Sequence, residues 1–148
     1  MNTRTISVVA EPTECRATID VAATPERVFQ ALASREVTSW WVRPGVFDTR
    51  EWTGDVRPGG QWKASGIGGG QPYSLEGEFL EVDPSRKLMH TWHLAGTPIP
   101  PSTVTYVLEP REGGTRIIFT HAGFPNREVS ERNAAGWETS FNRLAEIL

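Results

Sequence analysis

The sequence predicts one α+β domain, residues 1–148, in which helices lie on one side of a curved antiparallel sheet. Three observations support this fold class: an alternating strand near the N-terminus, a series of short β-rich runs in the middle, and a long amphipathic helix at the C-terminus. With 148 residues, the chain also has the length of an ordinary domain with a single core.

The N-terminal third is expected to hold one strand and two short helices. Small or apolar residues alternate with polar ones from Cys15 to Val21, which is typical of a half-buried strand. A helix follows, because Thr24 can cap it and Pro25 fits its first position. A second short helix, which Ser34 can cap, has its apolar positions at Val37, Trp40 and Trp41 and ends at Pro44-Gly45.

The middle of the chain predicts an antiparallel meander. Its expected strands are 46–52, 61–65, 73–82, 87–94, 102–109 and 115–122, and its turn signals fall at 57–60, 66–72, 83–85, 96–101 and 111–114. With the N-terminal strand, these runs give about seven strands in all.

The C-terminal segment predicts a long helix from about Glu128 to Leu148. Its apolar residues form one stripe, Ala134, Trp137, Phe141, Leu144 and Leu148. Gly136 interrupts this helix at a cost of about 1 kcal/mol relative to alanine, which indicates that another segment approaches its backbone closely. A curved sheet around this helix leaves a space that side chains can fill or leave as a pocket.

Composition excludes several classes of protein. The formal net charge is −3 and the basic residues are scattered, so we expect no nucleic-acid partner. Cys15 is the single cysteine, which favours a reducing, cytoplasmic location. The apolar run from Ile6 to Ala10 is too short for a signal peptide, and no later run reaches the length of a membrane span. We therefore expect no integral membrane association.

The residues that could carry chemistry are few. His90 and His93 should point to opposite faces of one strand, so we expect no metal site. His121 shares a face with Ile117 and Phe119, and it is the one candidate acid or base, although such a histidine is more often part of a core. No nucleophile motif and no nucleotide-binding glycine pattern occur, so we expect no cofactor.

Aromatic residues come from every element that should border the space under the C-terminal helix. The sequence leaves two accounts open, a core filled by these rings and a pocket walled by them. Neighbouring residues on a helix point about 100° apart, so one of Trp40 and Trp41 can anchor the short helix while the other reaches the mouth of the pocket. The candidate ligand-binding residues are Trp40, Trp41, Trp62, Trp92, Tyr106, Phe119, His121, Trp137 and Phe141.

Several fragments carry a family resemblance, among them "TIDVAATPERVFQAL", "DVRPGGQWK" and "GWETSFNRLAEIL". From about Ala17 to Leu148 the chain resembles the activator-of-heat-shock-protein-90-ATPase-like group of the START-like, helix-grip (SRPBCC) superfamily. The resemblance implies a sheet of about seven strands around a long C-terminal helix, with a cavity between them. Relatives use that cavity for lipids, sterols, plant hormones or polyketides, and a few catalyse cyclisation or dehydration there.

Binding of a small hydrophobic or amphipathic molecule, lipid-, sterol- or polyketide-like, is therefore the expected function. Two alternatives stay open: a cyclase- or lyase-type enzyme with His121 as acid or base, and a protein-interaction module of the co-chaperone kind. The sequence does not decide whether the protein is an enzyme, though it favours binding. It ranks a chaperone partner below a small ligand and leaves a homodimer open.

Overall fold

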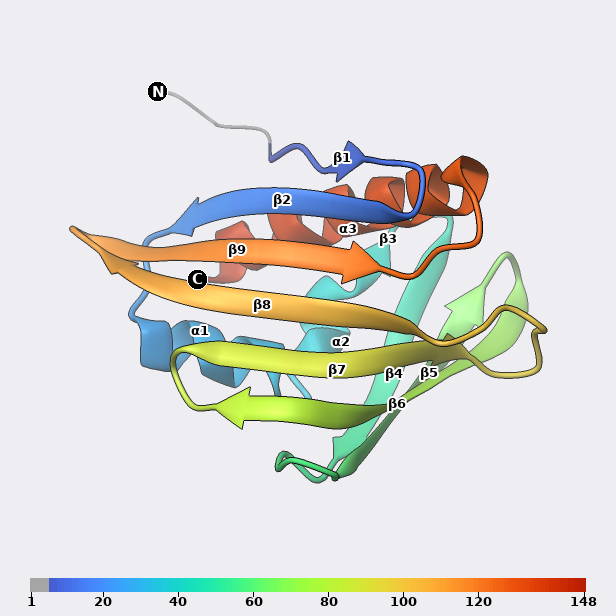
Figure 1. Cartoon of the computed structure of the whole chain (residues 1–148), viewed down its shortest axis with the longest axis horizontal. Coiled ribbons are helices and arrows are strands. Elements are labelled where there is room, and N and C mark those ends of the chain that lie inside the picture. The colour runs from blue at the N-terminus through green and yellow to red at the C-terminus, as the bar shows by residue number, and fades with distance from the viewer. Residues whose placement is uncertain (1–5) are drawn as a thin grey trace.

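The computed structural model describes residues 6–148, and it shows a strongly curved antiparallel sheet with three helices on its concave side (Figure 1). The first five residues belong to the N-terminal segment for which no signal peptide is expected, and they lie outside the described residues. In chain order, the elements are β1 (Val9–Ala10), β2 (Glu14–Val21), α1 (Pro25–Leu32), α2 (Val37–Trp40), β3 (Val42–Arg43), β4 (Phe47–Gly54), β5 (Gln61–Gly68), β6 (Gln71–Asp83), β7 (Lys87–Leu94), β8 (Ser102–Arg111), β9 (Gly114–Ala122) and α3 (Arg127–Ile147).

The strands form one sheet in the order β1-β2-β9-β8-β7-β6-β5-β4-β3, with every neighbouring pair antiparallel. From β4 to β9, strands that are consecutive in the chain lie side by side, as expected of a meander. The strand β2 then joins the sheet beside β9. This arrangement confirms the predicted helix-grip fold. The sheet has nine strands rather than about seven, because two-residue strands extend it at both edges.

The N-terminal elements follow their sequence signals. In β2, Cys15, Ala17, Ile19 and Val21 are buried and the residues between them are not. The hydroxyl of Thr24 accepts a hydrogen bond from the backbone N–H of Arg27 at 3.2 Å and so caps α1. The helix α2 is only a single turn.

The hairpin between β5 and β6 is tighter than predicted. The sequence indicates a loop over residues 66–72, but β5 continues to Gly68 and β6 begins at Gln71. Only Gly69 and Gly70 form the turn, with φ of 58° and 78°, values that favour glycine. Gly66 lies inside β5. A glycine is needed there because a Cβ atom would be 2.0 Å from the carbonyl oxygen of Asp48. This glycine therefore reflects a close approach of β4, and not a loop.

The helix α3 crosses the concave face of the sheet (Figure 1). It begins one residue before the predicted start, at Arg127, where the side chain of Asn126 accepts a hydrogen bond from the N–H of Val129 at 3.0 Å. Its buried residues are Ser130, Ala134, Trp137, Ser140, Phe141 and Leu144. The apolar stripe predicted from the sequence thus faces the sheet, and it forms the core together with the inner residues of the strands.

Candidate binding site

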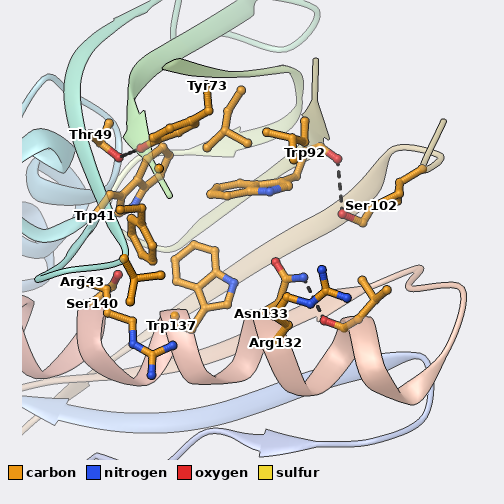
Figure 2. Close-up of a pocket in the computed structure, with 18 of the residues that line it drawn as sticks. Trp41, Arg43, Thr49, Tyr73, Trp92, Ser102, Arg132, Asn133, Trp137 and Ser140 are labelled. Atoms are coloured by element: carbon orange, nitrogen blue, oxygen red, sulfur yellow. Dashed lines mark hydrogen bonds between the residues drawn. The ribbon is translucent and has the colours of Figure 1, made fainter. Parts of the chain in front are cut away.

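A cavity of about 650 Å³ opens between α3 and the curved end of the sheet. Its walls are contributed by α3, by β4, by the β5–β6 hairpin and by the ends of β7 and β8 with the loop that joins them. Figure 2 shows three rings around the space: Trp92 on β7, Trp137 on α3 and Trp41, which lies between α2 and β3 and also lines the cavity. The other apolar wall residues are Val46, Phe47, Tyr73, Leu75, Leu94, Ile99, Pro100, Phe124 and Val129.

Three of the nine predicted ligand-binding residues line this cavity: Trp41, Trp92 and Trp137. The structure does not bring the other six to it: Trp40, Trp62, Tyr106, Phe119, His121 and Phe141 lie in the packed interior beyond the wall. Four of the six, Trp62, Tyr106, Phe119 and His121, lie on strands and are buried at the concave face of the sheet, whereas Trp40 and Phe141 lie on α2 and α3. That face is divided, however, because one part of it is packed solid against α3 and only the other part is open.

Trp137 forms the boundary between the packed and the open part. Its ring centroid lies 4.7 Å from that of Phe119 and 5.4 Å from that of Phe141 on the packed side. On the open side it lies 5.2 Å from that of Trp92. Both accounts left open by the sequence therefore apply, each to a different part of the same aromatic cluster.

Trp40 and Trp41 point in different directions, as expected of neighbouring residues at the end of a helix. Trp40 is fully buried and donates its indole N–H to the carbonyl of Ala31 at 3.0 Å, which ties α2 to α1. Trp41 lines the cavity, and no hydrogen-bond acceptor within residues 6–148 reaches its buried N–H.

Several wall residues were not predicted from the sequence, and Phe47 is the most informative of them. The sequence signal that could have indicated Phe47 is Gly136, because a Cβ atom at this position would lie 3.3 Å from the edge of the Phe47 ring. The glycine thus makes room for a ring of β4 and for the cavity beside it. Other missed wall residues are Arg43, Thr49, Tyr73, Ser102, Arg132, Asn133 and Ser140.

His121 is held in a chain of three hydrogen bonds behind the cavity wall. The indole N–H of Trp137 donates to Nδ1 of His121 at 2.9 Å. An indole nitrogen can only donate, so Nδ1 is the acceptor and the neutral ring carries its proton on Nε2. Nε2 then donates to the hydroxyl of Ser102 at 2.6 Å, and that hydroxyl donates to the carbonyl of Trp92 at 3.2 Å. Figure 2 shows this last bond at the cavity wall.

The hydrogen bond between His121 and Ser102 runs in the opposite direction to that of a catalytic serine–histidine pair. A general base must accept the serine proton on Nε2, whereas here Nε2 already carries a proton because of Trp137. Burial, with a smaller contribution from His90, lowers the pKa of His121 to about 3, so the ring is neutral at ordinary pH. His121 therefore orients Trp137 and Ser102, with both of its ring nitrogens engaged in hydrogen bonds.

The other two histidines, His90 and His93, lie on opposite faces of β7. His90 is buried and its Nδ1 donates to the carbonyl of Thr91 at 2.9 Å. Burial lowers the pKa of His90 to about 4. His93, on the opposite face of β7, lies 3.4 Å from a carboxylate oxygen of Glu76. Within the described part of the chain, His, Cys, Asp and Glu side chains form no group of three that could hold a metal ion.

A curved sheet gripping a long C-terminal helix, with a cavity walled by aromatic rings, defines a helix-grip domain of the kind that holds a small molecule. Residues 22–148 match the family model described as "Activator of Hsp90 ATPase homolog 1-like protein". The chain belongs to this family, which confirms the resemblance seen in the sequence.

Solved structures agree with this assignment. A protein from Chromobacterium violaceum is 25% identical with a TM-score of 0.82, over 91% of this chain and 96% of that one. An AHSA1 protein from Silicibacter pomeroyi is 26% identical with a TM-score of 0.75, over 90% and 95% of the two chains. A protein from Mycobacterium smegmatis, 21% identical over 97% and 96% of the chains, shares the fold with a TM-score of 0.81. The search of curated proteins gave no match.

The sequence contains no apolar run long enough for a membrane span, and the helices can be judged against that length. In residues 6–148, no helix is long and apolar enough to cross a membrane.

Proposed function

We propose that this protein binds a small hydrophobic or amphipathic molecule in the cavity between the sheet and α3. The observation that carries the proposal is the cavity itself, about 650 Å³ in volume and walled by the rings of Trp41, Trp92 and Trp137. This volume lies within the range of about 300–1,000 Å³ that is usual for small-molecule sites. Rigid rings supply a large apolar contact area at a small cost in side-chain entropy.

The enzyme alternative finds less support in the site. It requires His121 as acid or base, yet both ring nitrogens are already hydrogen-bonded and the imidazole does not line the cavity. The co-chaperone alternative rests on the family's description alone. Stimulation of a chaperone ATPase by the purified protein would favour that alternative over ligand binding.

A pair of leucine substitutions on α3 tests the proposal. Gly136→Leu places a side chain in the cavity, whereas Glu131→Leu adds the same side chain at an exposed position that does not line it. We expect members of a panel of fatty acids, sterols and flavonoids to raise the melting temperature and change the tryptophan emission of the wild type and of Glu131→Leu. A ligand at a hundred times its Kd stabilises a protein by about 2.7 kcal/mol.

In Gly136→Leu, the affinity for the same compounds should fall by about tenfold or more, because the cavity is occupied. Urea unfolding of the variant, measured in parallel, establishes that it is folded. Equal binding by both variants would place the ligand elsewhere, and a panel without any binding compound would refute the proposal.

A further inference from the structure

We propose that the ligand of this cavity is an anionic amphiphile, whose negatively charged head group is bound by Arg43, with Arg132 adding to the positive charge of the wall, while its apolar part lies among the tryptophans. This inference rests on the proposed function, and it specifies the chemical class of the ligand.

The charge of the cavity wall differs in sign from that of the protein. The whole chain has 18 acidic and 15 basic side chains and a net charge of −3. Among the described residues that line the cavity, in contrast, there are two arginines and no aspartate or glutamate. The wall is thus a local positive site on an acidic protein, and such a site attracts anions and repels cations.

Arg43 is the cavity-lining arginine whose guanidinium group is available to a ligand. It is half-buried on β3, and no ion pair or hydrogen bond of its side chain is present within residues 6–148. The nearby carboxylate of Asp48, on β4, is instead bound to Arg50 at 3.2 Å. A guanidinium group has five N–H donors in a fork that fits a carboxylate, sulfate or phosphate, and these donors are available to a ligand.

Arg132 stands on a different element, α3, and is more exposed. Among the described residues, the one carboxylate that pairs with it is that of Glu128, at 3.5 Å on the same helix and itself exposed, a contact of little energetic weight. In Figure 2, Arg43 and Arg132 are separated by Trp137, which stands between them in the view. A head group bound at Arg43 therefore lies beside the aromatic wall that would hold its tail.

The remaining polar groups of the wall point to the same chemistry. The hydroxyls of Thr49 and Tyr73 are hydrogen-bonded to each other, and the amide nitrogen of Asn133 donates to the carbonyl of Val129 at 3.0 Å (Figure 2). Trp41, whose side chain is buried, has an indole N–H without an acceptor in the described part of the chain. Buried donors normally have partners. Arg43 and Trp41 thus contribute N–H donors that have no acceptor within residues 6–148, and a ligand with acceptor oxygens satisfies them.

Three probes with the same ten-carbon chain test the inference at pH 8: decanoate and decyltrimethylammonium, each below its micelle concentration, and decanol below its solubility limit. Binding is measured by calorimetry and by tryptophan emission. We expect decanoate to bind about tenfold more tightly than decanol, which corresponds to about 1.4 kcal/mol, and the cation to bind most weakly. High salt should reduce the ratio of the decanoate to the decanol affinity, because ions screen the arginines.

Three substitutions locate the effect. Arg43→Gln and Arg132→Gln should each weaken decanoate binding, Arg43→Gln by about three- to tenfold, and leave decanol binding unchanged. The matched control is Arg57→Gln, an exposed arginine of the β4–β5 turn that is paired with Asp55 and does not line the cavity; it should change neither affinity.

The outcomes distinguish this inference from the function on which it rests. If decanol binds as tightly as decanoate, or if the arginine variants weaken both probes equally, the charged head group is refuted while the binding cavity stands. If none of the probes and no compound of the wider panel binds, the proposed function itself is refuted.

Discussion

Replacement of Trp137 by phenylalanine tests whether its indole N–H fixes the state of His121. The substitution keeps an aromatic ring but removes the donor that lies 2.9 Å from Nδ1 of His121. His121 is 0% exposed, so no bulk water replaces that donor. A buried acceptor left unpaired costs about 1–3 kcal/mol. The variant should therefore lose more stability than the smaller ring alone explains.

Trp41→Phe is the matched control for the change in ring size. Trp41 is 3% exposed and Trp137 is 5% exposed, and both line the cavity. The N–H of Trp41, however, lacks an acceptor among the described residues, so its loss removes an unsatisfied group instead of breaking a bond. We expect the free energy of unfolding of Trp137→Phe to be lower than that of Trp41→Phe by at least about 2 kcal/mol.

Urea unfolding, followed by far-ultraviolet circular dichroism at pH 7.5, measures this difference directly. The slope of the free energy against urea should be the same for both variants, so that the midpoints report stability alone. The expected difference corresponds to about 4–8 °C in melting temperature for a chain of this length. Equal losses in the two variants, or a larger loss in Trp41→Phe, would refute the assigned hydrogen-bond chain.

Three further predictions concern acid, helix α3 and the core. The pKa values of His90 and His121, lowered to about 4 and about 3, mean that the unfolded chain binds more protons below pH 6.5. The stability that these rings provide is thus complete above pH 6.5 and falls with pH by up to about 1.4 kcal/mol per unit for each ring. In His121→Asn, the slope of the unfolding free energy against pH should fall between pH 6.5 and 5 by the contribution of about one proton, about 1.4 kcal/mol per pH unit. An unchanged slope would contradict the lowered pKa of His121. Gly136→Ala should keep the stability measured in urea or raise it by up to about 1 kcal/mol, because alanine has the higher helix propensity. It should weaken ligand binding, because the added methyl group lies 3.3 Å from the Phe47 ring beside the cavity. A clear loss of stability would show that this ring cannot shift. Tyr106→Phe should raise the melting temperature, since the buried hydroxyl has no partner in residues 6–148 and its removal relieves about 1 kcal/mol or more; destabilisation would reveal a partner that the structure does not contain.

The architecture could be predicted because its signals are local. The alternation in β2 and the spacing of apolar residues in α3 each report which side of an element is buried, and nearly every turn carries its own glycine or proline. The length of β5 could not be predicted in the same way. Gly66 looks like a turn residue in the sequence, but the reason for it is the carbonyl of Asp48 on a neighbouring strand.

The site was predicted only in part, for a related reason. Periodicity assigned Phe119 to the concave face of the sheet and Trp137 to the side of the C-terminal helix that faces it, but it does not show where these two surfaces are packed together and where they are open. That division depends on Gly136 and Phe47, which are far apart in sequence and meet only in the fold. Arg43 gave no signal at all, because a single arginine beside a turn has no pattern that identifies a cavity wall.

The pairing of β2 with β9 has a consequence for how the protein is made. Glu14 pairs with Ala122 and Val21 with Thr115, so the partners are about a hundred residues apart in sequence. The hairpins from β4 to β9 can form as soon as each leaves the ribosome, whereas β2 emerges early and has to wait for its partner. Contacts of such long sequence separation slow folding, and an unpaired strand edge exposed in the meantime can pair with other chains. The nascent chain is therefore most vulnerable to aggregation in the interval before β9 is complete and β2 closes the sheet.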